Sequence, residues 1–73
     1  MLNLALTNMK LDDVLSKCWD NLIIVVPIHL KNNIYTIGIA TKNGKHQDPN
    51  TYTFDEAKKK VLNYYHWYYK KLD

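Results

Sequence analysis

Two runs of β-branched residues joined by a short asparagine turn constrain this chain more than any other feature. The runs span residues 22–30 and 34–41, and Lys31, Asn32 and Asn33 lie between them. Valine, isoleucine, tyrosine and threonine favour extended backbone, and asparagine tolerates the positive φ angles of a two-residue type I′ turn. The sequence therefore predicts an antiparallel β-hairpin in the middle of the chain.

A two-residue turn predicts the register of this hairpin. It pairs Lys31 with Ile34 and Val26 with Ile39, and one face of the hairpin then becomes apolar. That predicted core face consists of Ile24, Val26, Ile28, Leu30, Tyr35, Ile37 and Ile39. Pro27 would face Gly38, and because proline has no N–H the first strand is predicted to be an edge strand there, or bulged.

Two helices flank the hairpin. Apolar residues of the segment 11–22 recur at steps of three and four, and its stop is predicted at Asp20-Asn21. In the segment 54–71, Thr53 and Glu56 form a capping box, and Lys70 and Lys71 lie in the last turn. These patterns predict a helix at each end of the hairpin.

The predicted fold is one α+β domain over residues 1–73. Its order is helix, strand, strand, helix, with both helices covering one face of the hairpin. A two-stranded sheet is marginal alone, so we expect a short third strand from residues 1–7 or 51–53, or edge pairing in a dimer. Residues 42–45 are predicted to form a turn, and residues 46–50 an irregular loop. The hairpin followed by Thr-Phe-Asp-Glu-Ala at residues 53–57 resembles HicB-type antitoxins, but this pattern of capping and packing transfers no functional residues.

The last predicted helix carries the densest group of aromatic residues in the chain, at positions 64–69. A helix has one inward face, so six consecutive rings cannot all be buried. At about 100° per residue, the predicted core face consists of Phe54, Ala57, Val61, Tyr65, Tyr68 and Leu72, with Tyr64 at its edge. Trp67 falls on a flank between Lys60 and Lys71.

The remaining ring residues point elsewhere on this helix. His66 points away from the core beside Lys70, and Tyr69 lies with Leu62 on the other flank. Two interpretations of Trp67 remain open: it packs against the first helix, onto Trp19 or the N-terminal leucines, or it anchors a partner with a basic rim. The predicted partner-binding residues are Trp67, Lys60, Lys71, His66, Tyr69 and Lys70.

Composition argues against several classes of function. The net charge is +3, and all ten basic residues are lysine, which disfavours a sequence-specific DNA reader because arginine dominates such contacts. The three histidines and the single cysteine, Cys18, show no metal-binding spacing, and Gly38 and Gly44 alone cannot form a glycine-rich phosphate loop. We therefore predict no enzymatic activity, no metal and no cofactor.

The small size predicts a role in binding. A chain of 73 residues has a thin core, and partner binding or homodimerisation would stabilise it. The longest apolar run is seven residues, far below the ~20 of a membrane span, and a lone cysteine suits a reducing compartment, so we predict a cytoplasmic protein.

The leading prediction is a protein-binding module that inhibits or regulates a larger protein. By association with its size and its many lysine, asparagine, isoleucine and tyrosine residues, whose codons are AT-rich, it would be a viral or mobile-element inhibitor of the anti-CRISPR kind. The alternative is a lysine-mediated, weakly specific nucleic-acid-binding regulator that uses the exposed aromatics.

Overall fold

The computed structural model describes residues 11–72, and residues 1–10 and 73 lie outside the described part. Its elements are α2 (Leu11–Asp20), β1 (Ile24–Lys31), β2 (Ile34–Thr41), β3 (Gly44–Gln47) and α3 (Phe54–Lys71). The strands form one antiparallel sheet in the order β1-β2-β3, so β1 and β3 are its edges. The predicted α+β fold class is confirmed.

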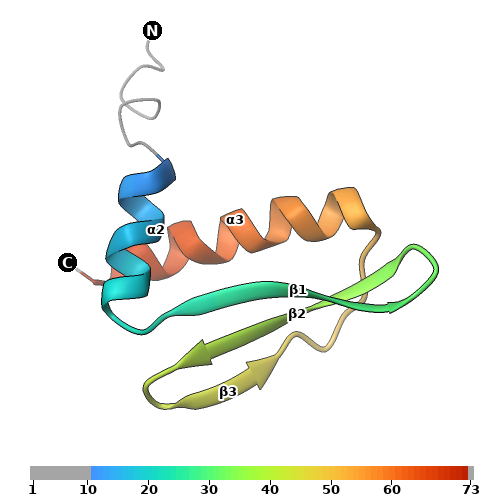
Figure 1. The fold of residues 1–73 in the computed structure, drawn as a ribbon, viewed down its shortest axis with the longest axis horizontal. Coiled ribbons are helices and arrows are strands. Elements are labelled where there is room, and N and C mark those ends of the chain that lie inside the picture. Colours follow the sequence, from blue (N-terminus) through green and yellow to red (C-terminus); the bar gives the residue numbers. More distant parts are fainter. Residues whose placement is uncertain (1–10, 73) are drawn as a thin grey trace, which may run out of the picture.

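The helices pack on the same side of the molecule. α3 runs along the sheet and contacts β1 and β2, whereas α2 stands across the C-terminal half of α3 at one end of the strands (Figure 1). Neither described helix is long and apolar enough to cross a bilayer.

Local signals explain where the helices begin and end. The Thr53 hydroxyl accepts the Glu56 amide, the Glu56 carboxylate accepts the Thr53 amide, and the Asn33 side chain accepts the Phe54 amide, so the predicted capping box is confirmed. α2 ends at Asp20, at the predicted stop, and Leu22 then adopts a φ of 63°. The Leu22 and Ile23 amides donate back to the carbonyls of Trp19 and Cys18, which is the Schellman pattern.

The predicted hairpin register is wrong over most of its length because β1 contains a bulge at Leu30. Lys31 faces Ile34 as expected, but Pro27 faces Ile37 and Val26 faces Gly38. In the predicted register Pro27 would occupy a hydrogen-bonded position opposite Gly38, which requires an N–H that proline lacks. The bulge moves Pro27 to a non-hydrogen-bonded position, so the ladder loses no bond there. β1 is therefore both an edge strand and a bulged one.

The turn and the third strand also differ from prediction. Of the two turn asparagines only Asn32 has a positive φ, 46°, and a type I′ turn needs positive φ at both central residues. The third strand is β3, which pairs with β2 through the Thr41–Gly44 turn, and not residues 51–53. Tyr52 makes an isolated bridge to Tyr35 instead. The predicted strand at residues 1–7 lies outside the described part of the chain.

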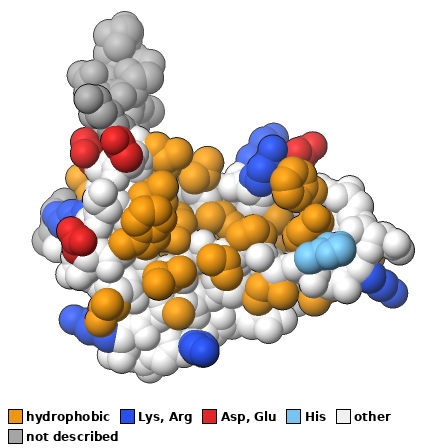
Figure 2. Space-filling view, viewed as in Figure 1, with side chains coloured by type: hydrophobic (Ala, Val, Ile, Leu, Met, Phe, Trp, Pro, Cys, Tyr) orange, Lys and Arg blue, Asp and Glu red, His pale blue; other side chains and the backbone are white. Residues whose placement is uncertain are grey.

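The one-residue shift reverses the two faces of β1. The core consists of Val14, Cys18, Ile23, Val25, Ile37, Ile39, Ala57 and Tyr65. Ile24, Val26, Ile28 and Leu30 were predicted to be buried, but they are exposed, and so is Phe54 on α3. The core is thin, and hydrophobic side chains remain visible over α2, α3 and β1 with lysines near the margins (Figure 2).

Candidate functional site

Tyr65 explains how α3 is attached to the edge strand β1. Its buried hydroxyl accepts the Val25 amide at 2.8 Å and the Trp19 Nε1–H at 3.1 Å, and it donates to the Val25 carbonyl at 3.0 Å. The Trp19 and Tyr65 rings meet edge to face at 6.5 Å. The structural role predicted for Tyr65 is confirmed. Within residues 11–72 the ring contact of Trp19 is with Tyr65 and that of Trp67 is with Tyr68, so stacking of Trp67 on Trp19 is not observed. The N-terminal leucines, the other packing partner considered for Trp67, lie outside the described residues.

Trp67 lies on the flank of α3 with its indole 53% exposed. The Lys71 ammonium lies over its ring, 4.6 Å from the centroid, and Tyr68 meets it edge to face at 4.9 Å. A shallow pocket of about 320 Å³ adjoins the indole, lined by Lys60, Asn63, Tyr64, Trp67 and Tyr68. We call these five residues together with Lys71 the Trp67 stripe. They recur at steps of one, three and four, so they follow one flank of the helix.

Lys60 links the Trp67 stripe to a buried acidic side chain. Its ammonium lies 6.0 Å from the ring centroids of Tyr52 and Tyr64. The hydroxyls of these tyrosines both donate to one oxygen of Asp48, at 2.8 and 2.7 Å, and the Asn50 amide donates to the other oxygen at 2.8 Å. This network joins the loop after β3 to α3 and holds the Tyr64 ring at the wall of the pocket.

The protonation states of this network follow from its contacts. Burial raises the pKa of the Asp48 carboxyl, but hydrogen bonds from Tyr64, Asn50 and Tyr52 and the charge of Lys60 outweigh it, so this pKa lies below its ordinary value. The hydrogen bond to Asp48, together with burial, raises the pKa of Tyr64 to about 12. Burial and the same carboxylate raise the pKa of Tyr52. Asp48 is thus a carboxylate that organises the loop, with its oxygens already satisfied.

A second hollow continues the pocket along α3 toward the start of the helix. It has about 510 Å³ and shares Lys60 and Asn63 with the first pocket. Its other lining residues are Asn50, Thr51, Tyr52, Glu56 and Lys59. The Trp67 stripe is therefore the aromatic end of a longer groove, whose other lining residues mostly carry polar or charged side chains.

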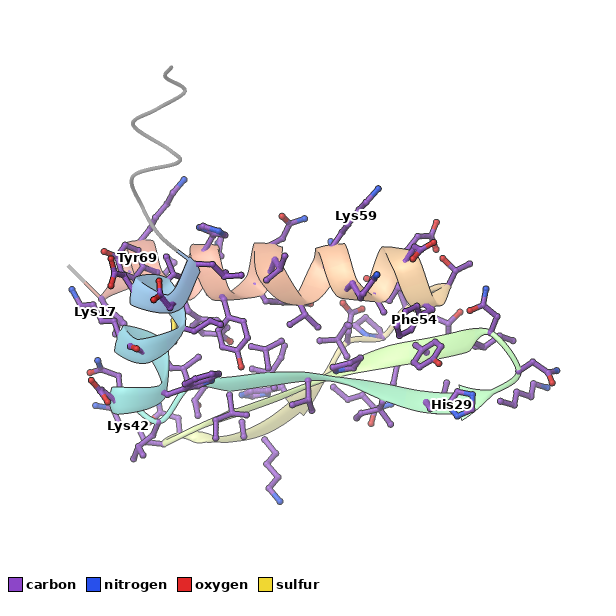
Figure 3. The ribbon with its side chains drawn as sticks, turned by 45° about the horizontal axis from the view of Figure 1, so that its top comes forward. Lys17, His29, Lys42, Phe54, Lys59 and Tyr69 are labelled. Atoms are coloured by element: carbon purple, nitrogen blue, oxygen red, sulfur yellow. The ribbon has the colours of Figure 1, made fainter. Side chains whose placement is uncertain are left out.

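The structure brings only half of the predicted site residues together. Trp67, Lys60 and Lys71 share the stripe. Tyr69 lies elsewhere, packed against the core beneath Lys17 of α2 at 5.4 Å, and Figure 3 shows both at the same end of the molecule. Lys70 is exposed and His66 half-buried, and neither lines the pocket.

The sequence-based prediction missed Asn63, Tyr64 and Tyr68 as pocket residues. The helical periodicity places Tyr68 on the predicted core face and Tyr64 at its edge, and it assigns no role to Asn63. Both tyrosines do pack against the core, yet each also lines the pocket with part of its ring. The spacing of Lys60, Tyr64, Trp67 and Lys71 at steps of four, three and four would have revealed the stripe.

Other chemistry in the described part of the chain is limited. Cys18 is buried, donates to the Tyr65 carbonyl at 3.5 Å, and burial raises the pKa of its thiol, which makes it a packing residue. Within residues 11–72, no group of three histidine, cysteine or acidic side chains could hold a metal ion.

Comparison of the chain with protein-family models, with curated proteins and with solved structures found no match.

Proposed function

We propose that this protein binds a larger protein through the Trp67 stripe and thereby regulates or inhibits that partner. One observation carries the proposal: the Trp67 indole is 53% exposed beside a pocket, between two lysines. Exposing an indole to water is costly, and buried tryptophans are prominent among the hot spots of protein interfaces.

The stripe indicates the chemistry of the partner. Its rim is cationic because Lys60 and Lys71 lie at its two ends, and among residues 11–72 no acidic side chain lines the pocket around Trp67. A complementary surface would carry carboxylates around an apolar recess that accepts the indole. The pocket of about 320 Å³ would in turn receive one projecting side chain of the partner.

Nucleic-acid binding is the second candidate, because lysines beside an exposed aromatic also suit a phosphate backbone and a stacked base. The geometry favours it less. The Lys71 ammonium occupies one face of the Trp67 ring at 4.6 Å, and stacking a base there requires displacing it. The lysines are also dispersed: Lys42 and Lys59 lie on different parts of the molecule (Figure 3).

Capture from native cells tests the first candidate. The wild-type chain, Trp67→Ala and Lys60→Ala are immobilised alongside the matched controls Leu62→Ala and Lys58→Ala, in which an exposed residue of the same helix lies outside both hollows of the groove. A protein retained by the wild type and by both controls should be lost with Trp67→Ala. With that protein purified, Trp67→Ala should weaken binding by about thirtyfold, the equivalent of a 2 kcal/mol hot spot. Equal retention by Trp67→Ala would place the binding surface elsewhere.

A salt titration tests the second candidate. The protein should not retard single- or double-stranded nucleic acid at low salt. Affinity that falls steeply with the logarithm of salt concentration, and that is reduced in Lys60→Ala, would assign the stripe to nucleic acid instead.

The counter-defence role rests on chain size and composition alone and stays a prediction. The Trp67 stripe indicates that the partner's surface carries acidic and apolar side chains. It does not indicate to which class of proteins the partner belongs. Expression of the protein in cells with an active CRISPR effector should restore transformation by a targeted plasmid, and Trp67→Ala should not. If the CRISPR effector still blocked transformation by the targeted plasmid, this role would be excluded, but the proposed binding of a protein partner would not.

A further inference from the structure

The two hollows along α3 join into one groove, which we call the α3 groove. The hollow of about 320 Å³ beside Trp67 and the hollow of about 510 Å³ toward the start of the helix share Lys60 and Asn63. From Glu56 at one end to Lys71 at the other, a helix rises about 22 Å, at about 1.5 Å per residue. An extended chain of about seven residues covers this distance.

One wall of the α3 groove is formed by the loop after β3, and the fold holds this loop in place. Asn50, Thr51 and Tyr52 of the loop line the larger hollow. The buried Thr36 hydroxyl is bonded to the carbonyls of Asp48 and Asn50, at 3.0 Å each, and the Tyr52 hydroxyl donates to the Asp48 carboxylate at 2.8 Å. Because these bonds order the wall before a ligand arrives, binding costs less conformational entropy.

The α3 groove presents cations and few free acceptors. Its three ammonium groups belong to Lys59, Lys60 and Lys71, and Glu56 is the acidic residue among its lining residues. Lys59 projects from α3 away from the sheet (Figure 3). The Glu56 carboxylate already accepts the Thr53 amide in the capping box. The groove therefore complements a ligand that carries hydrogen-bond acceptors and negative charge.

The described part of the chain does not neutralise these lysines. Within residues 11–72 the side-chain ion pair joins Lys58 to Asp55, and neither residue lines the groove. Asp48 offsets part of the Lys60 charge, but it is only 6% exposed and its carboxylate is bonded to the hydroxyls of Tyr52 and Tyr64. A ligand in the groove thus meets a surface that is cationic on balance.

We propose that the α3 groove binds an extended acidic segment of the partner, about seven residues long, with an apolar side chain at the end that meets Trp67. This inference rests on the protein binding proposed above and specifies which part of the partner is recognised. Carboxylates of the segment would contact the ammonium groups of Lys59 and Lys60, and the apolar side chain would enter the pocket beside the indole. Lysine acts as a point charge, so acidic residues at several spacings fit.

Selection from a phage-displayed library of random peptides, carried out on the immobilised full chain, tests the proposal. The enriched peptides should carry several aspartates or glutamates beside an aromatic residue or a leucine, and a blank surface should not retain them. A selection that enriches no peptide over the blank surface, or one that enriches neutral or basic peptides, would overturn the proposal.

Fluorescence polarisation with one labelled peptide from the selection locates its binding site. Lys60→Gln keeps most of the aliphatic stem beside Tyr64 and removes the charge, so it should weaken binding about fivefold, whereas Lys60→Arg should keep the affinity. Lys58→Gln, at an exposed lysine of the same helix outside the groove, is the matched control and should bind like the wild type. Changing the acids of the peptide to amides should weaken its binding to the wild type more than its binding to Lys60→Gln.

Three results would refute the extended acidic segment. Equal losses in Lys60→Gln and Lys58→Gln would show general attraction to a basic protein. Displacement of the peptide by single-stranded oligothymidylate, at a lower concentration than by unlabelled peptide, would assign the groove to nucleic acid. An amide peptide that binds the wild type as tightly as the acidic one would exclude charge recognition, and this result decides the matter if circular dichroism shows that Lys60→Gln is unfolded.

The two proposals can fail separately. A protein that is captured from native cells and lost with Trp67→Ala, together with a library that yields no acidic peptide, would refute the extended segment and leave protein binding in place. A captured protein that Trp67→Ala retains would instead refute the Trp67 stripe as the binding surface, whatever peptides the library yields.

Discussion

Replacing Tyr65 with phenylalanine tests how the helical layer is attached to the sheet. The substitution keeps the ring, its place in the core and its edge-to-face contact with Trp19. It removes only the hydroxyl, which satisfies the amide and carbonyl of Val25 and the Nε1–H of Trp19. Any loss of stability therefore reports on these hydrogen bonds.

The expected loss is large for a protein of this size. Leaving a buried polar group without a partner costs about 1–3 kcal/mol, and Tyr65→Phe leaves two such groups on Val25. Trp19 is half exposed, so water can replace its bond at little cost, and relaxation of the edge strand admits some water to Val25. We expect a loss of about 2–3 kcal/mol from a free energy of unfolding of about 3–5 kcal/mol.

Urea denaturation followed by circular dichroism measures this loss. Because the midpoint scales with the free energy of unfolding at constant m, it should fall by roughly half or more. Tyr69→Phe is the control, since Tyr69 is only partly buried at the margin of the core, and its free energy of unfolding should change by less than about 0.5 kcal/mol. If Tyr65→Phe were as mild as Tyr69→Phe, the hydroxyl would not attach α3 to β1 as described.

Four further predictions concern the other supports of the fold. Leu22→Gly should raise the free energy of unfolding by about 1 kcal/mol, because glycine adopts the φ of 63° without a Cβ clash; a destabilised variant would show that the exposed leucine contributes more than the strain costs. Thr53→Ala removes the acceptor for the Glu56 amide and should cost about 1 kcal/mol in thermal or urea unfolding, whereas a neutral result would mean that the Asn33 contact alone caps α3. The depressed pKa of Asp48 stabilises the fold above its unfolded-state pKa of about 3.9, and this contribution is lost as pH falls through the folded-state value, so the stability difference between wild type and Asp48→Asn should shrink in acid. An unchanged difference from neutral to strongly acidic pH would contradict the carboxylate assignment. Conversely, the Tyr64 phenolate should appear in ultraviolet titration only near pH 12, and the stability that the raised pKa provides below pH ~10 should be lost across that interval.

The elements that local chemistry specifies were predictable. α3 begins and ends at residues 54 and 71 as expected, because a capping box and terminal lysines act within one turn of helix. β2 spans residues 34–41 as expected. The strand β3 was not predictable in the same way, because Gly44–Gln47 has no apolar alternation and is exposed throughout, so only its pairing with β2 makes it a strand.

The candidate site was predictable in part for a similar reason. Helical periodicity places Trp67, Lys60 and Lys71 on one flank without knowledge of the sheet. Periodicity cannot show that Tyr64 is oriented by Asp48, because Asp48 belongs to a loop sixteen positions away. It also cannot separate Tyr69 from the site, since the Lys17 contact depends on how α2 crosses α3.

By itself, the sequence determined the two helices, the hairpin and its turn position, and the aromatic flank of the last helix. Only the tertiary structure decided which side of β1 faces the core. Proline cannot donate to the ladder, so a bulge at Leu30 moves Pro27 out of a hydrogen-bonded position and reverses the faces of the strand. Either face of this strand is apolar enough to be buried, so hydrophobic pattern alone could not choose between them. Backbone hydrogen bonding made the choice, and it left Ile24, Val26 and Ile28 on the open side of the sheet.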